Sequence, residues 1–215
     1  SPKQIGTDTT WASFGNRGFG GPPGKSSSLF IKTDGTAWSA GRNTYGVLGL
    51  NQPGPSSAPT RYSSPVQIGT DTNWKSASGI SMDAKVATKS DGTLWGWGRN
   101  DDGALGINDA AARSSPVQIP APGPGTTTWQ TALGKFSSGA SCGYAINTDN
   151  ELWVWGDNDS GKLGLNQGPS AGLDYVHHQF NYLDHGHLLK EEMIALMESR
   201  RMEQHGHGEP MPLED

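Results

Sequence analysis

The segment DGTLWGWGRN, residues 91–100, decides the fold because it recurs in the chain. Its relatives are DGTAWSAGRN at residues 34–43 and DNELWVWGDN at residues 149–158, so the copies are 57 and 58 residues apart. A binding site is usually built once, whereas a scaffold is built by repetition. We therefore interpret the tryptophan-rich segment as a structural repeat and not as an aromatic binding site.

The sequence around this segment repeats as well. The upstream copies are SPKQIGTDTTW (1–11), SPVQIGTDTNW (64–74) and SPVQIP (115–120), and the downstream copies are YGVLGLN (45–51), DGALGIN (102–108) and SGKLGLN (160–166). The pattern predicts three repeats over residues 1–63, 64–114 and 115–172, and then a tail over residues 173–215. A start at SPKQI fits either a mature start after a removed methionine or a cut at a repeat boundary.

The composition is typical of short strands joined by turns. Of 215 residues, 31 are glycine and 14 are proline, and 33% are hydrophobic. Glycine and proline break helices and populate turns. The eight tryptophans argue against disorder, because large rings gain free energy by burial. A single cysteine, Cys142, excludes an intrachain disulfide, and we expect it to be buried in a strand.

The charge is distributed unevenly. Residues 1–172 hold 13 basic against 12 acidic side chains, and residues 173–215 hold 3 against 9. Neither part is the basic surface that nucleic acid binding requires, so we expect no nucleic acid partner. The sequence has no N-terminal leader pattern and no apolar run of the roughly 20 residues that span a bilayer. We therefore expect a soluble chain.

The aromatic residues of each repeat alternate in the way a strand requires. Trp95 and Trp97 are two residues apart and Gly96 lies between them, so in a strand both rings face one side. The small intervening residue indicates close approach of a neighbouring sheet or strand on the other side. The first repeat keeps one ring and has Ala40 in place of the second. The predicted core tryptophans are Trp38, Trp95, Trp97, Trp153 and Trp155.

Each repeat contains about four short β-prone runs. Asp-Gly or Asp-Asn separates two of them, and these dipeptides favour a tight hairpin turn. A sheet of this size cannot bury its faces alone, so the repeats must stack. We expect an all-β fold of three propeller-type four-stranded blades, as an open or partial propeller, with a short α-helical C-terminal tail.

These residues carry a family resemblance. DGTLWGWGRNDDGALGIN, followed by RSSPVQI, resembles the repeat of the regulator of chromosome condensation family, whose members form seven-bladed propellers. This chain departs from the family in having three repeats and in lacking the His-Thr pair before the hairpin. The resemblance implies one of several functions: nucleotide exchange on a small GTPase with chromatin binding, inhibition of β-lactamases, or a structural role in tailed bacteriophages. The amino-acid sequence of the repeats is most similar to the bacterial and phage branch of this family.

Three segments imitate catalytic or ligand-binding motifs. GASCG (139–143) resembles a nucleophile elbow at Ser141, but no histidine precedes residue 177 to act as its base. DNDSG (157–161) resembles the start of a calcium loop, but it lacks the closing carboxylate and aligns with turns in the other repeats. GFGGPPG (18–24) lacks the context of a phosphate loop, and we interpret it as an inserted loop. We expect no enzyme activity and no cofactor.

The tail follows a different pattern. Residues 187–204, HLLKEEMIALMESRRMEQ, predict a helix whose apolar stripe is Leu189, Met193, Leu196 and Met197. One helix of this length is marginal alone, so the stripe docks either on the last blade or on a partner as an anchor. Weak metal-ligand candidates are His185, His187, His205 and His207, but the intervening glycines give little preorganisation, so we expect no metal site.

These observations lead to two functional hypotheses. The first is a non-enzymatic assembly protein, a bacteriophage virion component such as a fibre, decoration or tail-associated protein. In this hypothesis the blades are the scaffold, the tail is the anchor, and the partners are virion proteins or further copies of the chain. The alternative is a protein-binding module or inhibitor that acts through the propeller loops GFGGPPG and PAPGPGTTT (120–128).

Overall fold

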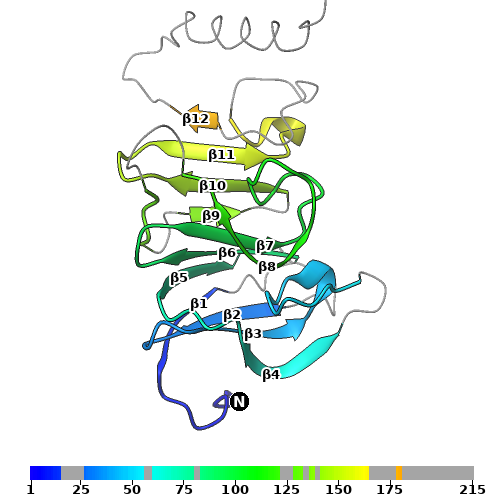
Figure 1. Ribbon diagram of the computed structural model, residues 1–215, viewed down its shortest axis with the longest axis vertical. Coiled ribbons are helices and arrows are strands. Elements are labelled where there is room, and N and C mark those ends of the chain that lie inside the picture. The colour runs from blue at the N-terminus through cyan, green and yellow to red at the C-terminus, as the bar shows by residue number, and fades with distance from the viewer. Residues whose placement is uncertain are drawn as a thin grey trace, which may run out of the picture. The chain divides into compact units, whose positions relative to one another are not determined.

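Three antiparallel sheets make up the described part of the protein. The computed structural model describes residues 1–15, 27–55, 60–79, 83–121, 128–132, 136–138, 141–164 and 178–180. Within these ranges the chain forms three four-stranded sheets and no α-helix (Figure 1). The expected all-β class is confirmed. The chain divides into two compact units, Ser1–Asn181 and Tyr182–Asp215, and the second unit, with the predicted helix over 187–204, lies outside the described residues.

Consecutive strands are neighbours in every sheet. The first sheet contains β1 (Trp11–Gly15), β2 (Ser27–Lys32), β3 (Ala37–Arg42) and β4 (Arg61–Gln67). The second contains β5 (Trp74–Gly79), β6 (Ala84–Lys89), β7 (Leu94–Gly98) and β8 (Arg113–Ile119). The third contains β9 (Phe136–Ser138), β10 (Cys142–Ile146), β11 (Leu152–Gly156) and β12 (His178–Phe180). Short 3₁₀ helices, η1 (Thr44–Gly46) and η2 (Asp159–Gly161), follow β3 and β11.

The sheets are offset from the predicted repeats. The SPVQ segments open the second and third repeats in sequence, but they form β4 and β8, the last strands of the first and second sheets. The repeated sequence shows how many residues separate equivalent strands. It does not show which neighbouring strands are hydrogen-bonded in one sheet. The third sheet takes β12 as its last strand, beyond the expected boundary at residue 172. Gln179 in β12 is paired with Trp153, as Gln118 is with Trp95.

The predicted hairpins are confirmed. Strands β2 and β3, β6 and β7, and β10 and β11 pair antiparallel across the expected turns. The side chain of Asp91 accepts hydrogen bonds from the backbone N–H and hydroxyl of Thr93, at 3.0 and 2.6 Å. Thr93 thereby lowers the pKa of the Asp91 carboxyl. The first hairpin repeats this arrangement with Asp34 and Thr36.

The second tryptophan of the repeated motif connects its sheet to the preceding sheet. The indole nitrogen of Trp97 donates to the carbonyl oxygen of Val47 at 2.9 Å, and that of Trp155 donates to Ala104 at 2.9 Å. Both rings have 0% exposure. We call the contact between the first and second sheets the first junction and that between the second and third sheets the second junction. Each junction therefore contains a fully buried indole with a satisfied N–H.

A backbone contact reinforces each junction. The N–H of Trp74, at the start of β5, donates to the carbonyl of Gly35 in the preceding hairpin at 3.0 Å, and Trp129 donates to Gly92 at 2.9 Å. Gly35 has a φ of +77°, and a Cβ atom there would lie 2.0 Å from the carbonyl oxygen of Thr72. The hairpin turn is therefore packed directly against the segment that enters the next sheet.

The core contains different tryptophans from those predicted. Trp97 and Trp155 are buried as expected, but the first ring of each motif, at Trp38, Trp95 and Trp153, is only partly buried. Trp95 and Trp153 lie at the margins of the buried clusters, and in the second sheet the Lys89 ammonium covers the Trp95 ring at 3.9 Å. Two other rings are in the core and were not predicted there: Trp74 and Trp129 are 4% and 2% exposed.

The expected close approach behind Gly96 is also confirmed. A Cβ atom at Gly96 would lie 3.2 Å from side-chain carbons of both Ile119 and Leu105. The side of β7 opposite the indoles is thus covered by residues of its own sheet and of the loop that follows it.

Candidate functional site: a groove between the first and second sheets

An open groove of about 440 Å³ lies between the first and second sheets. Its size is in the range of ligand-binding clefts. The loop after η1, strand β4 and the segment that follows β4 form one wall. Residues of β5, β7 and the middle of β8 form the other. The lining residues are Gly49, Leu50, Asn51, Gln52, Tyr62, Val66, Gln67, Ile68, Gly69, Asp71, Trp74, Trp95, Ser115 and Pro116.

A buried asparagine shapes the wall of the first sheet. The Asn43 side-chain oxygen accepts from the N–H of Leu48 at 3.1 Å, and its nitrogen donates to the Gln52 carbonyl at 3.1 Å. Asn43 has 0% exposure, so these bonds form away from water, where an unmade bond is costly. The two hydrogen bonds of the buried Asn43 side chain therefore hold the loop that carries Asn51 and Gln52 in one conformation.

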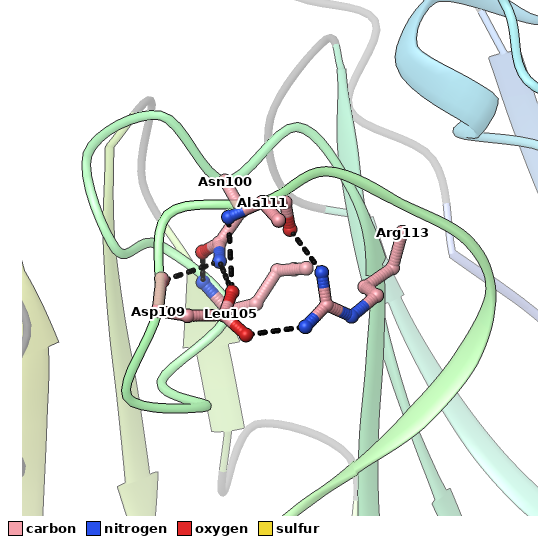
Figure 2. A network of polar contacts seen from close by, with 5 residues as sticks. All are labelled: Asn100, Leu105, Asp109, Ala111 and Arg113. Carbon is pink, nitrogen blue, oxygen red and sulfur yellow. Dashed lines mark hydrogen bonds and ion pairs between the residues drawn. The ribbon is translucent and has the colours of Figure 1, made fainter.

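The same device fixes the opposite wall (Figure 2). The Asn100 oxygen accepts from the Leu105 N–H at 2.9 Å, and its nitrogen donates to the carbonyl and carboxylate oxygens of Asp109 at 2.6 and 3.1 Å. Arg113 then forms an ion pair with Asp109 and donates to the Ala111 carbonyl at 2.9 Å. This network anchors the start of β8, which supplies Ser115 and Pro116 to the groove.

The two walls are also bonded to each other. The Asn51 N–H donates to the Ser114 carbonyl at 2.8 Å, and the Ser115 hydroxyl donates to the Asn51 side-chain oxygen at 3.1 Å. These bonds join residues of the first sheet's loop to β8 of the second sheet. The groove is consequently a preformed feature of the first junction.

One end of the groove is aromatic and charged. The ring centroids of Trp74 and Trp95 are 6.1 Å apart in an edge-to-face arrangement. The Lys89 ammonium lies 4.8 and 3.9 Å from these centroids and forms an ion pair with Asp71 at 2.7 Å. Because Lys89 covers a face of Trp95, that face is closed to a stacking ligand.

The remaining lining groups are amides, a phenol and aliphatic side chains. The Tyr62 hydroxyl donates to the Gln52 side-chain oxygen at 2.6 Å. The carboxylate of Asp71, paired with Lys89, is the formal charge among the lining residues. Asn51, Gln52 and Gln67 each carry a donor and an acceptor. This combination is suited to a peptide backbone, which also presents donors and acceptors in alternation.

A buried lysine lies beside the first junction. Lys85 is 3% exposed, and its ammonium donates to the carbonyl of Ser27 in the first sheet at 3.0 Å. Burial lowers the pKa of Lys85 to about 8, although the charge of Asp83 acts in the opposite direction. Lys85 is outside the groove lining, and we assign it to the packing of the two sheets.

The segments that resemble a nucleophile elbow and a calcium loop form ordinary parts of the sheet and its turns. Ser141 precedes β10, a strand, so the strand-to-helix turn of a nucleophile elbow is not formed there. DNDSG includes η2 and forms the turn that the repeat alignment predicts: Asp157 accepts from the N–H of Asp159 and is paired with Lys162. Cys142 is buried in β10 as expected.

Other predicted candidates lie outside the described residues. These are GFGGPPG (18–24), most of PAPGPGTTT (120–128), His185, His187, His205 and His207, and the stripe of Leu189, Met193, Leu196 and Met197. Within the described ranges, no group of three or more His, Cys, Asp or Glu side chains is placed to hold a metal ion. In the same ranges, no helix is long and apolar enough to cross a membrane.

Sequence reasoning did not find the groove. Its residues come from the loop after η1, from β4 and from the second sheet, and no motif marks this convergence. One available signal was the asparagine that recurs as Asn43, Asn100 and Asn158 in the three copies of the quoted segment. All three are buried, and each accepts from a backbone N–H five residues later.

The repeat has a known counterpart. Residues 91–146 match the family model of the regulator of chromosome condensation (RCC1) repeat. Residues 91–146 therefore resemble one RCC1 repeat. The matched residues run from the hairpin before β7 to the end of β10, so the match spans the second junction.

Two curated relatives carry similar sequence. The X-linked retinitis pigmentosa GTPase regulator of Canis lupus familiaris is 31% identical over 58% of this chain and 12% of its own length. The probable E3 ubiquitin-protein ligase HERC6 of Homo sapiens is 30% identical over 66% of this chain and 13% of its own length. The chain thus spans about an eighth of the length of these relatives.

Solved structures share the fold. Yeast RCC1 (Prp20), in a crystal structure with Kap60, has a TM-score of 0.57 and 17% identity over 72% of this chain and 35% of that chain. A structure of Prp20p from Saccharomyces cerevisiae, described with its binding to Gsp1p and histones, gives the same score and identity. The chain is accordingly a β-propeller repeat protein in its fold.

Proposed function

We propose that the chain is a non-enzymatic protein-binding module that takes up an extended peptide segment of a partner in the groove between the first and second sheets. The observation that carries this proposal is the groove itself, which combines aromatic rings with neutral amides on a preformed frame. Aromatic anchors surrounded by polar groups are typical of protein-binding surfaces.

The chemistry of the groove favours a peptide over a sugar. Sugars stack on exposed aromatic faces, whereas Lys89 covers a face of Trp95. The amides of Gln52 and Gln67 lie along the first sheet's wall, where a backbone running beside β4 would find alternating partners. The protein partners of yeast Prp20p, which are Gsp1p and histones, support a protein-binding role for an RCC1-type chain.

A display experiment tests the proposal. A library of random peptides is selected on the immobilised chain, and the affinity of enriched peptides is measured for the unmodified chain and for a Gln67→Ala, Tyr62→Ala variant. We expect the double variant to bind at least about tenfold more weakly, since it loses an anchor ring and an amide. Phe14→Ser is the matched control, because Phe14 is exposed on β1 and is not a lining residue.

Two results would reject the groove as the binding site. Peptides that bind the unmodified chain and the double variant equally well must bind elsewhere. A library that yields no binder, together with a glycan array that does, would replace the peptide with a sugar.

We further propose that this protein-binding module is part of a bacteriophage virion. The sequences of SPVQIGTDTNW and KSDGTLWGWG resemble the bacterial and phage branch of the repeat family, and this resemblance supports a role as a structural component of a bacteriophage virion. Neighbouring genes test it: virion genes on both sides would support this role, and genes of a secretion or signalling system would argue for a binding module outside a virion.

A further inference from the structure

The aromatic end of the groove contains a buried hydrogen-bond donor without an acceptor. Trp74 is 4% exposed and lines the groove. Its indole nitrogen is buried and has no hydrogen-bond partner among the described residues. A buried polar group without a hydrogen bond is costly, so proteins rarely leave one unless water or a ligand completes it. The Trp74 N–H is therefore a candidate contact for a ligand.

The second junction indicates the direction of this N–H. Trp129 is the counterpart of Trp74, and its N–H donates to the carbonyl of Ile119 at 3.4 Å. The two rings are placed alike, because their centroids lie 6.0 and 6.1 Å from the second tryptophan of the motif, at interplanar angles of 65° and 56°. Ile68, the counterpart of Ile119, lines the groove. The unpaired N–H of Trp74 is thus directed toward the groove wall at Ile68.

The same end of the groove contains an acceptor with an unused oxygen. Asp71 lines the groove and binds Lys89 through its carboxylate oxygen Oδ2. Its counterpart in the first repeat is Asp8, whose other oxygen, Oδ1, accepts from the backbone N–H and the hydroxyl of Thr10 at 2.9 and 2.6 Å. In the second repeat Asn73 stands in place of Thr10. Among the described residues, Asp71 Oδ1 has no equivalent bond, and the Asp71 side chain is 53% exposed.

The unused donor and the unused acceptor are neighbours. The Lys89 ammonium lies 2.7 Å from the Asp71 carboxylate and 4.8 Å from the centroid of the Trp74 ring. One small group with two polar atoms can therefore contact both residues. The ion pair with Lys89 already balances the charge of Asp71, so a neutral group can complete the contact.

A primary amide has the two polar atoms that this arrangement requires. Its oxygen accepts from the indole N–H, and its nitrogen donates to the carboxylate. An ammonium or guanidinium lacks the acceptor, and a carboxylate lacks the donor and is repelled by Asp71. We propose that Asp71, Trp74 and Lys89, which we call the amide site, select a glutamine or asparagine side chain of the bound peptide. This inference rests on the proposed function, the binding of a peptide in the groove.

A comparison of two peptide libraries tests this selection. One display library contains all residue types, the other omits glutamine and asparagine, and both are selected on the full chain. We expect the first library to yield peptides with an amide residue at a shared position that bind about tenfold or more tightly than the best peptides of the second.

The outcome separates the amide site from the groove. Equal affinities from both libraries, with binding still weakened by the Gln67→Ala, Tyr62→Ala double variant, would overturn the amide site and leave the peptide groove in place. No binder from either library would overturn both proposals.

An exchange of amide and carboxylate identifies the contact with Asp71. The selected glutamine peptide is compared with the same peptide carrying glutamate. The unmodified chain should prefer glutamine by about tenfold or more in dissociation constant, and Asp71→Asn should lose or reverse this preference, because its amide can donate to the glutamate. Asp8→Asn is the matched control: Asp8 is also paired with a lysine beside two tryptophans, but it does not line the groove. The same preference in all three proteins would contradict the contact.

A further variant occupies the acceptor without removing it. Asn73→Thr introduces the hydroxyl that Thr10 donates to Asp8, and this hydroxyl should bind Asp71 Oδ1. We expect the glutamine peptide to bind about tenfold more weakly, and the same peptide with leucine in place of glutamine to keep its affinity. Circular dichroism checks that the variant is folded. Unchanged binding of the glutamine peptide would exclude Asp71 Oδ1 as its acceptor.

The donor is tested by the NMR signal of the Trp74 indole N–H, identified by its loss in Trp74→Phe. We expect this signal to shift when the glutamine peptide binds and to shift much less with the leucine peptide. Equal shifts with both peptides, or none with either, would overturn the amide site.

Discussion

At the scale of single residues, the two tryptophans of one motif have different roles. Trp97 is fully buried and donates its N–H to a carbonyl of the preceding sheet. Trp95 remains partly exposed, and its N–H donates at 2.8 Å to Thr93 within its own hairpin. Their spacing places both rings against Trp74, but only the second ring crosses the junction.

Substitution of these rings should separate their roles. Trp97→Phe and Trp155→Phe each leave a buried carbonyl without its donor and create a cavity. We expect each to lower the free energy of unfolding by about 2–4 kcal/mol. Trp95→Phe is the control and should cost about 1 kcal/mol, because its hydrogen bond is at the margin. Urea denaturation measures all three, and equal losses would show that the junction has no special dependence on the second ring.

Lys85 should make stability depend on pH in the alkaline range. Its pKa is about 8 in the folded chain and has its ordinary value of 10.5 in the unfolded chain. Between these values the unfolded chain holds a proton that the folded chain has released, so the free energy of unfolding rises with pH. The total rise is on the order of 3 kcal/mol. Lys85→Met should remove this rise, and denaturation curves of both proteins from pH 7 to about 11 test it. The same slope in both proteins would exclude Lys85 as its source.

At the scale of elements, loops and hairpins position the strands that form the groove. The Asn100 network holds the loop between β7 and β8 (Figure 2). The Asn43 side chain holds the loop between β3 and β4. The sequence predicted the hairpins because Asp-Gly favours the positive φ angles that a tight hairpin turn requires. It did not predict that SPVQ completes the preceding sheet, because that depends on long-range pairing.

Removal of the Asn100 side chain should loosen this frame. Asn100→Ala deletes three hydrogen bonds and leaves the buried N–H of Leu105 without a partner. We expect a loss of about 2–4 kcal/mol in the free energy of unfolding. The neighbouring Asp101→Ala is the control: it removes a surface ion pair with Arg99 and should cost less than about 1 kcal/mol. If chemical denaturation shows similar losses for both variants, the asparagine network stabilises the chain no more than a surface ion pair does.

The first hairpin should be equally sensitive at Gly35. Gly35→Ala combines a left-handed φ with a Cβ atom 2.0 Å from the Thr72 carbonyl oxygen, so the junction must shift. We expect a loss of more than about 3 kcal/mol. Gly69→Ala has a similar φ of +58° and nothing within 4 Å, so it should cost only about 1–2 kcal/mol. Thermal unfolding of both variants checks the difference, and two equal losses would mean that backbone strain alone limits this turn.

At the scale of the whole molecule, the described sheets are connected in series through equivalent contacts. The period of the sequence predicted an all-β repeat fold, and the RCC1 match over residues 91–146 agrees with it. The groove could not be predicted in this way, because it exists only where the first and second sheets meet. The repeated residues form the sheets, and the proposed function depends on the groove between the first and second sheets.

The most direct test of peptide binding in the groove is amide hydrogen exchange of the chain with and without a peptide selected by display. We expect added protection in the segments that line the groove, residues 49–52, 62–71 and 115–116, with little change in β1. Protection that appears instead in the hairpin turns or in β1, with the groove segments unchanged, would contradict the assignment of the groove as the protein-binding site.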